Sequence, residues 1–119
     1  MTEITIIDPQ AIDNLRSLNP GDNDSFLREI TGIFLEDTPL RLAELDQSIV
    51  SGDVAKFTRA AHSIKGSSAN LGALALRAVA EKLENEARTH GISGLSALVQ
   101  QLKDEFIRAE NALAQLTAK

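Results

Sequence analysis

The chain has 119 residues, of which 12 are Lys or Arg and 17 are Asp or Glu, and its formal net charge is -5. This length predicts a single domain, residues 1–119, that buries a core without covalent cross-links. The absence of Cys excludes a disulfide framework and any thiolate metal site. The acidic balance and the absence of Trp and Tyr argue against nucleic acid as a partner.

The N-terminal residues indicate no targeting segment. Residues 1–8 contain neither a basic region nor a long apolar run, and no other stretch reaches membrane-spanning length. We therefore expect a soluble cytoplasmic monomer that makes no membrane contact. Because Met1 stands shortly before the first helical pattern, its position also favours a complete small protein over a domain cut from a longer one.

A short helix is predicted near the N-terminus. Asp8 and Pro9 suit its N-cap and first helical position, because an aspartate side chain accepts a backbone hydrogen bond there and proline has no N–H to lose. The Asn-Pro-Gly run at residues 19–21 should end this helix. Its apolar side is formed by Ala11, Ile12, Leu15 and Leu18.

A long second helix is predicted up to Ser51, with Asn23 or Asp24 as its N-cap. Apolar residues recur at helical spacing along it, namely Leu27, Ile30, Phe34, Leu42, Leu45 and Ile49. Pro39 falls inside this pattern, where it removes one hydrogen-bond donor and clashes with the preceding turn. We therefore expect a kink or break at Pro39, with two separate helical halves as the alternative.

Three further helices are predicted in the rest of the chain. Asp53 suits the N-cap of the third, Gly72 and Gly91 follow the last periodic residues of the third and fourth, and Ser93 can cap the fifth. The three apolar sides are formed by Val54, Phe57, Ala61, Ile64, Ser68 and Leu71, by Leu76, Val79, Leu83 and Ala87, and by Leu95, Leu98, Leu102, Phe106, Ala109, Leu113 and Leu116. Short connections between the last four helices predict an all-α fold, an antiparallel up-down-up-down four-helix bundle with the short N-terminal helix across one end.

One run, His-Ser-Ile-Lys-Gly-Ser-Ser-Ala-Asn-Leu-Gly-Ala at residues 62–73, contains an unusual pattern. His62, Lys65 and Gly66 stand at i, i+3 and i+4 on one face of the third helix, so the imidazole has a cation on one side and no side chain on the other. Between Val54 and Ala80 there are four basic residues and no acidic ones. Such a charge run alone is typical of a solvated helix face, but around His62 it also suits a phosphoryl group and an acidic partner.

Read with Ala61 before it, this run resembles the signature of histidine phosphotransfer (HPt) domains, a His followed by Lys-Gly at i+3 and i+4, a Ser two residues later and a Gly four beyond that. The resemblance implies a phosphorelay intermediate that accepts a phosphoryl group on His62 from an aspartyl phosphate of a receiver domain and passes it to another receiver, or works in reverse. It implies response-regulator receiver domains and a sensor or hybrid histidine kinase as partners. It also implies no kinase activity and no cofactor of the chain's own, with Mg²⁺ held by the receiver.

The residue types fit that chemistry. A neutral imidazole, with an ordinary pKa of about 6.5, is a nucleophile without needing a base. Phosphoryl transfer depends mainly on positioning and on neutralising charge on the equatorial oxygens, so Lys65 is expected to stabilise the phosphate as a point charge. Gly66 costs a helix roughly 1 kcal/mol relative to Ala, which is understandable if a partner must approach closely beside His62.

The partner is expected to dock around His62. Four residues of the third helix are the candidate contacts on this face, namely Ala55, Thr58, Arg59 and Ala69. That face is too small for an interface of about 1,000 Å², so neighbouring helices must contribute. Phe26 and Ile33 fall off the apolar side of the second helix and are the candidates for an exposed patch, whereas Ile12 and Leu15 fit a core position equally well.

Other functional interpretations fit the sequence less well. The run from Lys65 to Ser68 superficially resembles a phosphate-binding loop, but it lies within a helical pattern and follows no strand. His62 and His90 are 28 positions apart and make a poor metal site without Cys, and His90 suits a structural place at a helix end. Ser67 and Ser68 suit bonds to carbonyls one turn earlier. The remaining alternative is a non-catalytic helical interaction module in which His62 is incidental.

Overall fold

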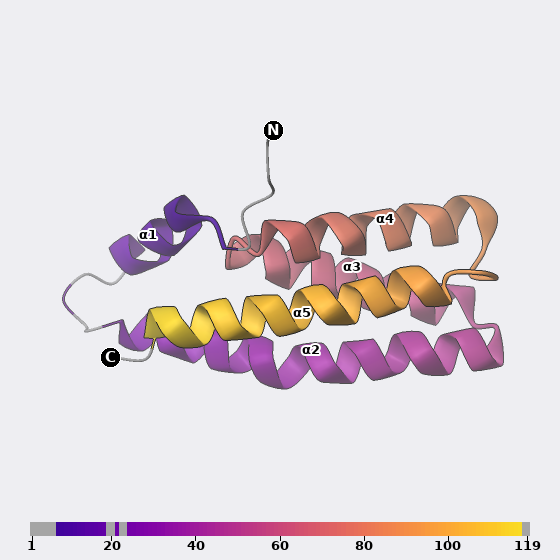
Figure 1. Cartoon of the computed structure of the whole chain (residues 1–119), viewed down its shortest axis with the longest axis horizontal. Helices are drawn as coiled ribbons and strands as arrows, with labels where there is room; N and C mark the ends of the chain where they lie inside the picture. Colours follow the sequence, from indigo (N-terminus) through magenta and orange to yellow (C-terminus); the bar gives the residue numbers. More distant parts are fainter. Residues whose placement is uncertain (1–6, 19–20, 22–23, 118–119) are drawn as a thin grey trace.

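A computed structural model describes residues 7–18, 21 and 24–117 of the chain. The helices in this described part are α1 (Pro9–Leu18), α2 (Ser25–Ser51), α3 (Val54–Asn70), α4 (Leu74–His90) and α5 (Ser96–Thr117). Helix α2 packs on α3 and α5, and α4 packs on the same two helices. These four helices therefore form a closed bundle, in which successive helices run in opposite directions (Figure 1). The predicted fold class is confirmed, and α1 lies at the end of the bundle where α2 begins (Figure 1). Among these helices, none is both long enough and apolar enough to cross a membrane.

The start of α1 is as predicted. The Asp8 carboxylate accepts a hydrogen bond from the backbone N–H of Gln10 at 3.1 Å, and the helix begins at Pro9. Ile12 is buried, but the prediction for Leu18 is wrong, since it is 70% exposed. The reason is its place as the last residue of α1, where the amphipathic pattern runs out. The predicted terminating residues 19 and 20 lie outside the described residues.

Helix α2 is continuous through Pro39, so the predicted break and the alternative of two separate halves are wrong, and a kink there stays a prediction. Pro39 lies on the exposed side of the helix, while Thr38 and Leu42 on either side of it are buried. Burial of the side opposite Pro39, along the whole length of α2, offsets the roughly 3 kcal/mol that a mid-helix proline costs. Asp24 occupies the N-cap position, but its carboxylate accepts from Arg16 Nε at 3.0 Å instead of capping the helix. Asn23 lies outside the described residues.

The predicted apolar sides of α3, α4 and α5 face the core with one exception. Val54 is 39% exposed because it is the first residue of α3 and stands at the corner between two helices. The predicted N-cap at Ser93 is also wrong. Gly94 has a left-handed φ of +82°, and the Leu95 N–H donates to the Ile92 carbonyl at 3.3 Å, so a turn that buries Ile92 delays the start of α5 to Ser96.

Gly72 joins the N-terminal segment to the bundle. Helix α3 ends at Asn70, one residue before the last periodic residue, and Gly72 follows with a left-handed φ of +70° close to the predicted helix end. Its carbonyl accepts a hydrogen bond from the Asp8 N–H at 2.7 Å. A Cβ atom at Gly72 would lie 2.6 Å from the Ala11 Cβ, so this position needs glycine for its backbone conformation and for its packing.

Candidate functional site

Helix α3 presents His62 to solvent because its neighbours fix which side of the helix is buried. Ala61 and Ile64 are fully buried in the core, and Asp53 caps the helix by accepting from the Lys56 N–H at 3.0 Å. The His62 side chain consequently lies on the outer side and is 62% exposed. The predicted nucleophile is therefore accessible to a partner.

The inner edge of the imidazole contacts a carboxylate that the sequence analysis missed. Glu84 of α4 is only 1% exposed, and its Oε2 atom lies 2.8 Å from His62 Nδ1. Helix α4 packs against α3, and its neighbouring residues Leu83 and Ala87 belong to the core. An acidic residue inside the apolar side of a helix is itself unusual, and this signal could have identified Glu84 from the sequence.

Two cations share the same carboxylate. Lys65 Nζ lies 2.7 Å from Glu84 Oε1, and Arg88 Nη2 lies 2.8 Å from Glu84 Oε2. The zone that the sequence indicates as purely basic thus contains one buried negative charge between two positive ones. The structure brings Lys65 to the site as predicted, but its ammonium group contacts Glu84. Arg88 stands one helical turn after Glu84 and was not predicted either.

The charge state of Glu84 follows from these contacts. Burial by itself raises the pKa of the carboxyl, but hydrogen bonds from Lys65 and His62, together with the charges of Lys65 and Arg88, outweigh it and hold the pKa below its ordinary value of 4.5. Glu84 is therefore ionised at neutral pH and can only accept hydrogen bonds. A neutral His62 must then carry its proton on Nδ1, which leaves the lone pair on Nε2, the nitrogen that does not contact Glu84.

Small and open positions surround the ring along α3. Gly66 is exposed, and a Cβ atom built on it would have no neighbour within 4 Å. Internal packing therefore does not explain this glycine. Ala55 and Ala69 are exposed as well, seven residues before and after His62, so the side chains in line with His62 on this face of α3 are small.

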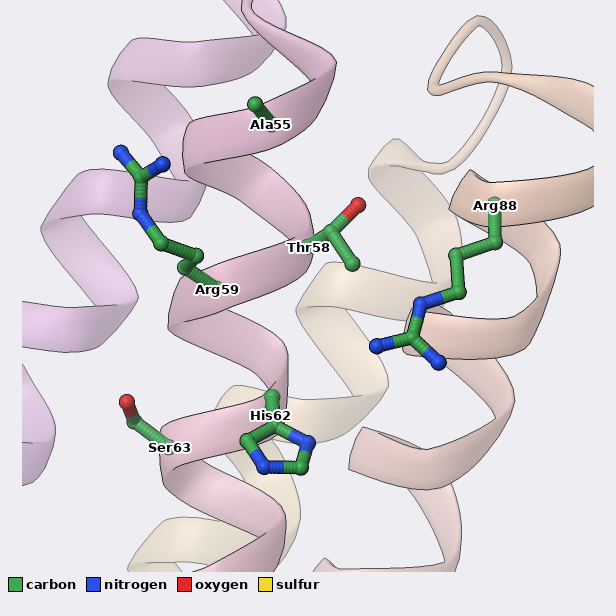
Figure 2. A pocket seen from close by; sticks show the side chains of 6 residues that line it. All are labelled: Ala55, Thr58, Arg59, His62, Ser63 and Arg88. Carbon is green, nitrogen blue, oxygen red and sulfur yellow. The ribbon is translucent and has the colours of Figure 1, made fainter.

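A hollow of about 500 Å³ lies beside His62 toward the N-terminal end of α3. It is lined by Ala55, Thr58, Arg59, His62, Ser63 and Arg88. Figure 2 shows that Arg88 extends from α4 toward the imidazole, whereas Arg59 points away on the other side of α3. The predicted docking residues Ala55, Thr58 and Arg59 therefore border the same hollow as the nucleophile.

The predicted docking residues of α2 differ from each other in exposure. Ile33 is 56% exposed, while Phe26 is half-buried. A groove of about 160 Å³ runs between α2 and the end of α3, and Ile33 lines it. The full lining is Ile30, Ile33, Phe34, Asp37, Ser67, Asn70 and Leu71. The structure thus places Ile33, but not Phe26, in a groove that borders α3.

Two serines of the motif and the second histidine of the chain make local contacts. Ser67 and Ser68 both donate to the carbonyl of Ile64, as the sequence predicts. His90 is the last residue of α4, and its Nδ1 lies 3.3 Å from Glu86 Oε2 at the surface. It has no place in the cluster around Glu84, so the site contains a single histidine.

Comparison with known proteins identifies the family of the chain. The model of the Hpt domain family matches residues 29–112. The chain is 28% identical over 93 residues to the multistep phosphorelay regulator 1 of Schizosaccharomyces pombe, covering 78% of this chain but only about a third (32%) of the relative's length. It is 26% identical over 115 residues to histidine-containing phosphotransfer protein 1 of Arabidopsis thaliana, covering 93% of this chain and 73% of that protein.

A solved structure of a phosphotransfer protein has the same fold as this chain. The histidine-containing phosphotransfer protein B of Pseudomonas aeruginosa PAO1 superposes with a TM-score of 0.86 at 26% identity, covering 98% of this chain and 97% of that one. The family match spans most of the bundle, including α3 and α4, which form the site. The chain therefore belongs to the Hpt domain family, the histidine-containing intermediates of phosphorelays.

Proposed function

We propose that the chain carries a phosphoryl group on Nε2 of His62, between the aspartyl phosphate of one receiver domain and the aspartate of another. The contact between Glu84 Oε2 and His62 Nδ1 at 2.8 Å is the observation that supports this most strongly. It orients the ring, assigns the proton to Nδ1 and directs the free lone pair outward.

The transfer step then needs no proton to leave the site. The Nε2 lone pair forms the bond to phosphorus, and the bond from phosphorus to the receiver's aspartyl oxygen breaks, with its electron pair staying on that oxygen. Since Nδ1 keeps its proton, the ring becomes positively charged. The Glu84 carboxylate beside Nδ1 balances this charge. In the reverse direction the same cationic ring is a good leaving group.

Lys65 and Gly66 have distinct parts in this proposal. Lys65 holds Glu84 Oε1 in place at 2.7 Å and adds positive charge close to the transferring group. Its direct contact with the phosphoryl oxygens stays a prediction. Gly66 keeps the helix surface low, so that the receiver's aspartate can approach Nε2 closely.

The receiver would dock over α3 and the start of α2. Its contacts would be Ala55, Thr58, Arg59, Ala69, Ile33 and Phe26, of which Phe26 offers less surface because it is half-buried. The exposed side of Ile33 and the groove beside it would accept an apolar side chain of the receiver. The hollow beside His62 has room for the receiver's loops around its phosphorylated aspartate.

The chain needs no cofactor in this proposal, because the phosphoryl group arrives on the receiver's aspartate and the receiver supplies the Mg²⁺ for the transfer. The carrier has no kinase activity of its own, and the phosphate originates at a sensor or hybrid histidine kinase. Cytoplasmic location and a monomeric state remain predictions. The alternative of an interaction module with an incidental His62 is not favoured, because such a module has no need of a buried carboxylate that orients the ring.

A transfer assay tests the proposal. A receiver domain carrying a radiolabelled aspartyl phosphate should label the wild-type chain, and the label should be acid-labile and base-stable. His62→Gln should abolish labelling with an unchanged helical circular dichroism spectrum. His90→Gln is the matched control and should label normally, since His90 lies outside the site. Labelling retained by His62→Gln, or lost in His90→Gln alone, contradicts the assignment.

A further inference from the structure

The two cations on Glu84 are not equivalent. The Lys65 side chain is 28% exposed and has Oε1 to itself, whereas the Arg88 side chain is 60% exposed and shares Oε2 with His62 Nδ1. The guanidinium of Arg88 is therefore held next to the imidazole by a common oxygen atom. It also lines the hollow into which the exposed edge of His62 opens (Figure 2).

A phosphoryl group on Nε2 changes the balance of charge at this point. In the free protein, Lys65 and Arg88 provide two positive charges and Glu84 one negative charge around a neutral ring. After transfer the ring is positive and holds Glu84 more strongly through Nδ1, while the phosphate adds a dianion on the outer side. Arg88 then competes poorly for Oε2, and the phosphate offers it oxygens with the geometry that a guanidinium fork binds best.

We propose that Arg88 exchanges partners during the relay: it pairs with Glu84 while His62 is free and donates to the phosphoryl oxygens once they are bound to Nε2. This inference rests on the proposed function. Arg88 is suited to the movement because more than half of its side chain is already in solvent, and because Glu84 keeps Lys65 and the positive ring as partners when Arg88 leaves. Lys65 remains behind and keeps Glu84 ionised and in place.

The lifetime of the phosphohistidine tests this exchange. The whole chain can be phosphorylated by phosphoramidate without a receiver, and the decay of the phosphohistidine can be followed by ³¹P NMR. We expect Arg88→Ala to shorten the half-life about fivefold, the scale of one solvent-accessible charge-assisted hydrogen bond. Arg88→Lys should recover only part of the loss, because an ammonium cannot form the two parallel bonds of a guanidinium.

Arg77→Ala is the matched control. It removes the same charge from the same helix, where Arg77 pairs with Glu81 at 3.7 Å and not with Glu84. The exchange predicts a wild-type half-life for this variant, and it predicts that the Arg88 Nε–H resonance of the wild type shifts on phosphorylation. A wild-type half-life in Arg88→Ala, an equal loss in Arg77→Ala, or an unmoved Arg88 resonance would overturn it.

Two further readouts separate the possible failures. If the wild-type chain takes up no phosphate on His62, the proposed function fails and this inference with it. If the wild type is labelled but Arg88→Ala decays normally, only the inference fails. The contact between His62 Nδ1 and Glu84 should persist in unphosphorylated Arg88→Ala, because Lys65 still holds the carboxylate. A displaced ring in that variant would assign Arg88 a structural role in the free state and contradict the exchange.

Discussion

Three nitrogen atoms converge on the carboxylate of Glu84, and the state of the His62 ring depends on them. The sequence predicted the accessible histidine, the neighbouring lysine and the open glycine, because these residues lie within one helical turn. It could not pair His62 with Glu84, which is 22 residues away on another helix. That contact depends on the relative register of α3 and α4, and spacing within one helix carries no information about it.

The lowered pKa of Glu84 predicts a pH-dependent stability. The carboxyl titrates below 4.5 in the folded state and near 4.5 when unfolded, so the stabilisation by its ionised form is present above pH 4.5 and lost as the pH falls through the folded value. Glu84→Gln lacks this contribution. The free energy of unfolding in urea should therefore be lower in the variant than in the wild type above pH 4.5, and this gap should shrink as the pH falls below 4.5. A gap that is independent of pH would argue against a paired carboxylate.

Gly66 gives a prediction that separates folding from function. Since a side chain at this position meets open space, Gly66→Gln should raise the free energy of unfolding by about 0.5–1 kcal/mol through helix propensity. The same side chain should obstruct the receiver and reduce the transfer rate at least tenfold. Gly66→Ala should stabilise equally but transfer faster than the glutamine variant. A wild-type rate of phosphoryl transfer in Gly66→Gln would contradict the steric role of this glycine.

At the scale of whole helices, apolar periodicity predicted the five elements and their buried sides. Errors occurred where a local signal competed with tertiary packing. The proline rule predicted a kink or break at Pro39, but burial of the opposite side keeps α2 continuous, so no break forms. A serine suited to capping suggested an early start for α5, but the turn that buries Ile92 comes first. Leu18 and Val54 are at helix ends, where periodicity continues although no neighbour covers the residue.

Helix α2 carries a prediction about receiver docking. Ile33 is exposed beside the groove that borders α3, so Ile33→Asp should weaken receiver binding about tenfold while the melting temperature changes little. Leu40→Asp is the matched control, because Leu40 is an apolar residue of the same helix that is at least as exposed as Ile33 but does not line this groove. Isothermal titration with a receiver measures both. Equal weakening by the two variants, or none by Ile33→Asp, would move the docking surface elsewhere.

On the scale of the whole molecule, the four-helix bundle holds the two sides of the site together. His62 and Lys65 come from α3, and Glu84 and Arg88 come from α4, so the site exists only when these helices are packed. The N-terminal segment closes the end of the bundle through the contact of Asp8 with Gly72. The sequence indicated Gly72 as a helix end but not its long-range partner, since such a contact leaves no periodic trace.

Gly72→Ala tests this closure. Both Gly72 and Gly52 have a left-handed φ, but only at Gly72 would a Cβ atom meet the N-terminal segment, while at Gly52 it meets nothing within 4 Å. Gly52→Ala should therefore cost about 1 kcal/mol for the backbone alone, and Gly72→Ala about 1–3 kcal/mol more for displaced packing. Thermal unfolding of the two variants measures the difference. Equal losses would show that the N-terminal segment adds nothing at this position.

The position of phosphorus on the imidazole shows whether His62 accepts the phosphoryl group through Nε2. In a chain labelled with ¹⁵N at histidine and phosphorylated by its receiver, the coupling between ³¹P and the ring nitrogens identifies the bonded atom. We expect coupling to Nε2 of His62, with Nδ1 still protonated and facing Glu84. Phosphorus on Nδ1 of His62, or on either nitrogen of His90, would contradict it.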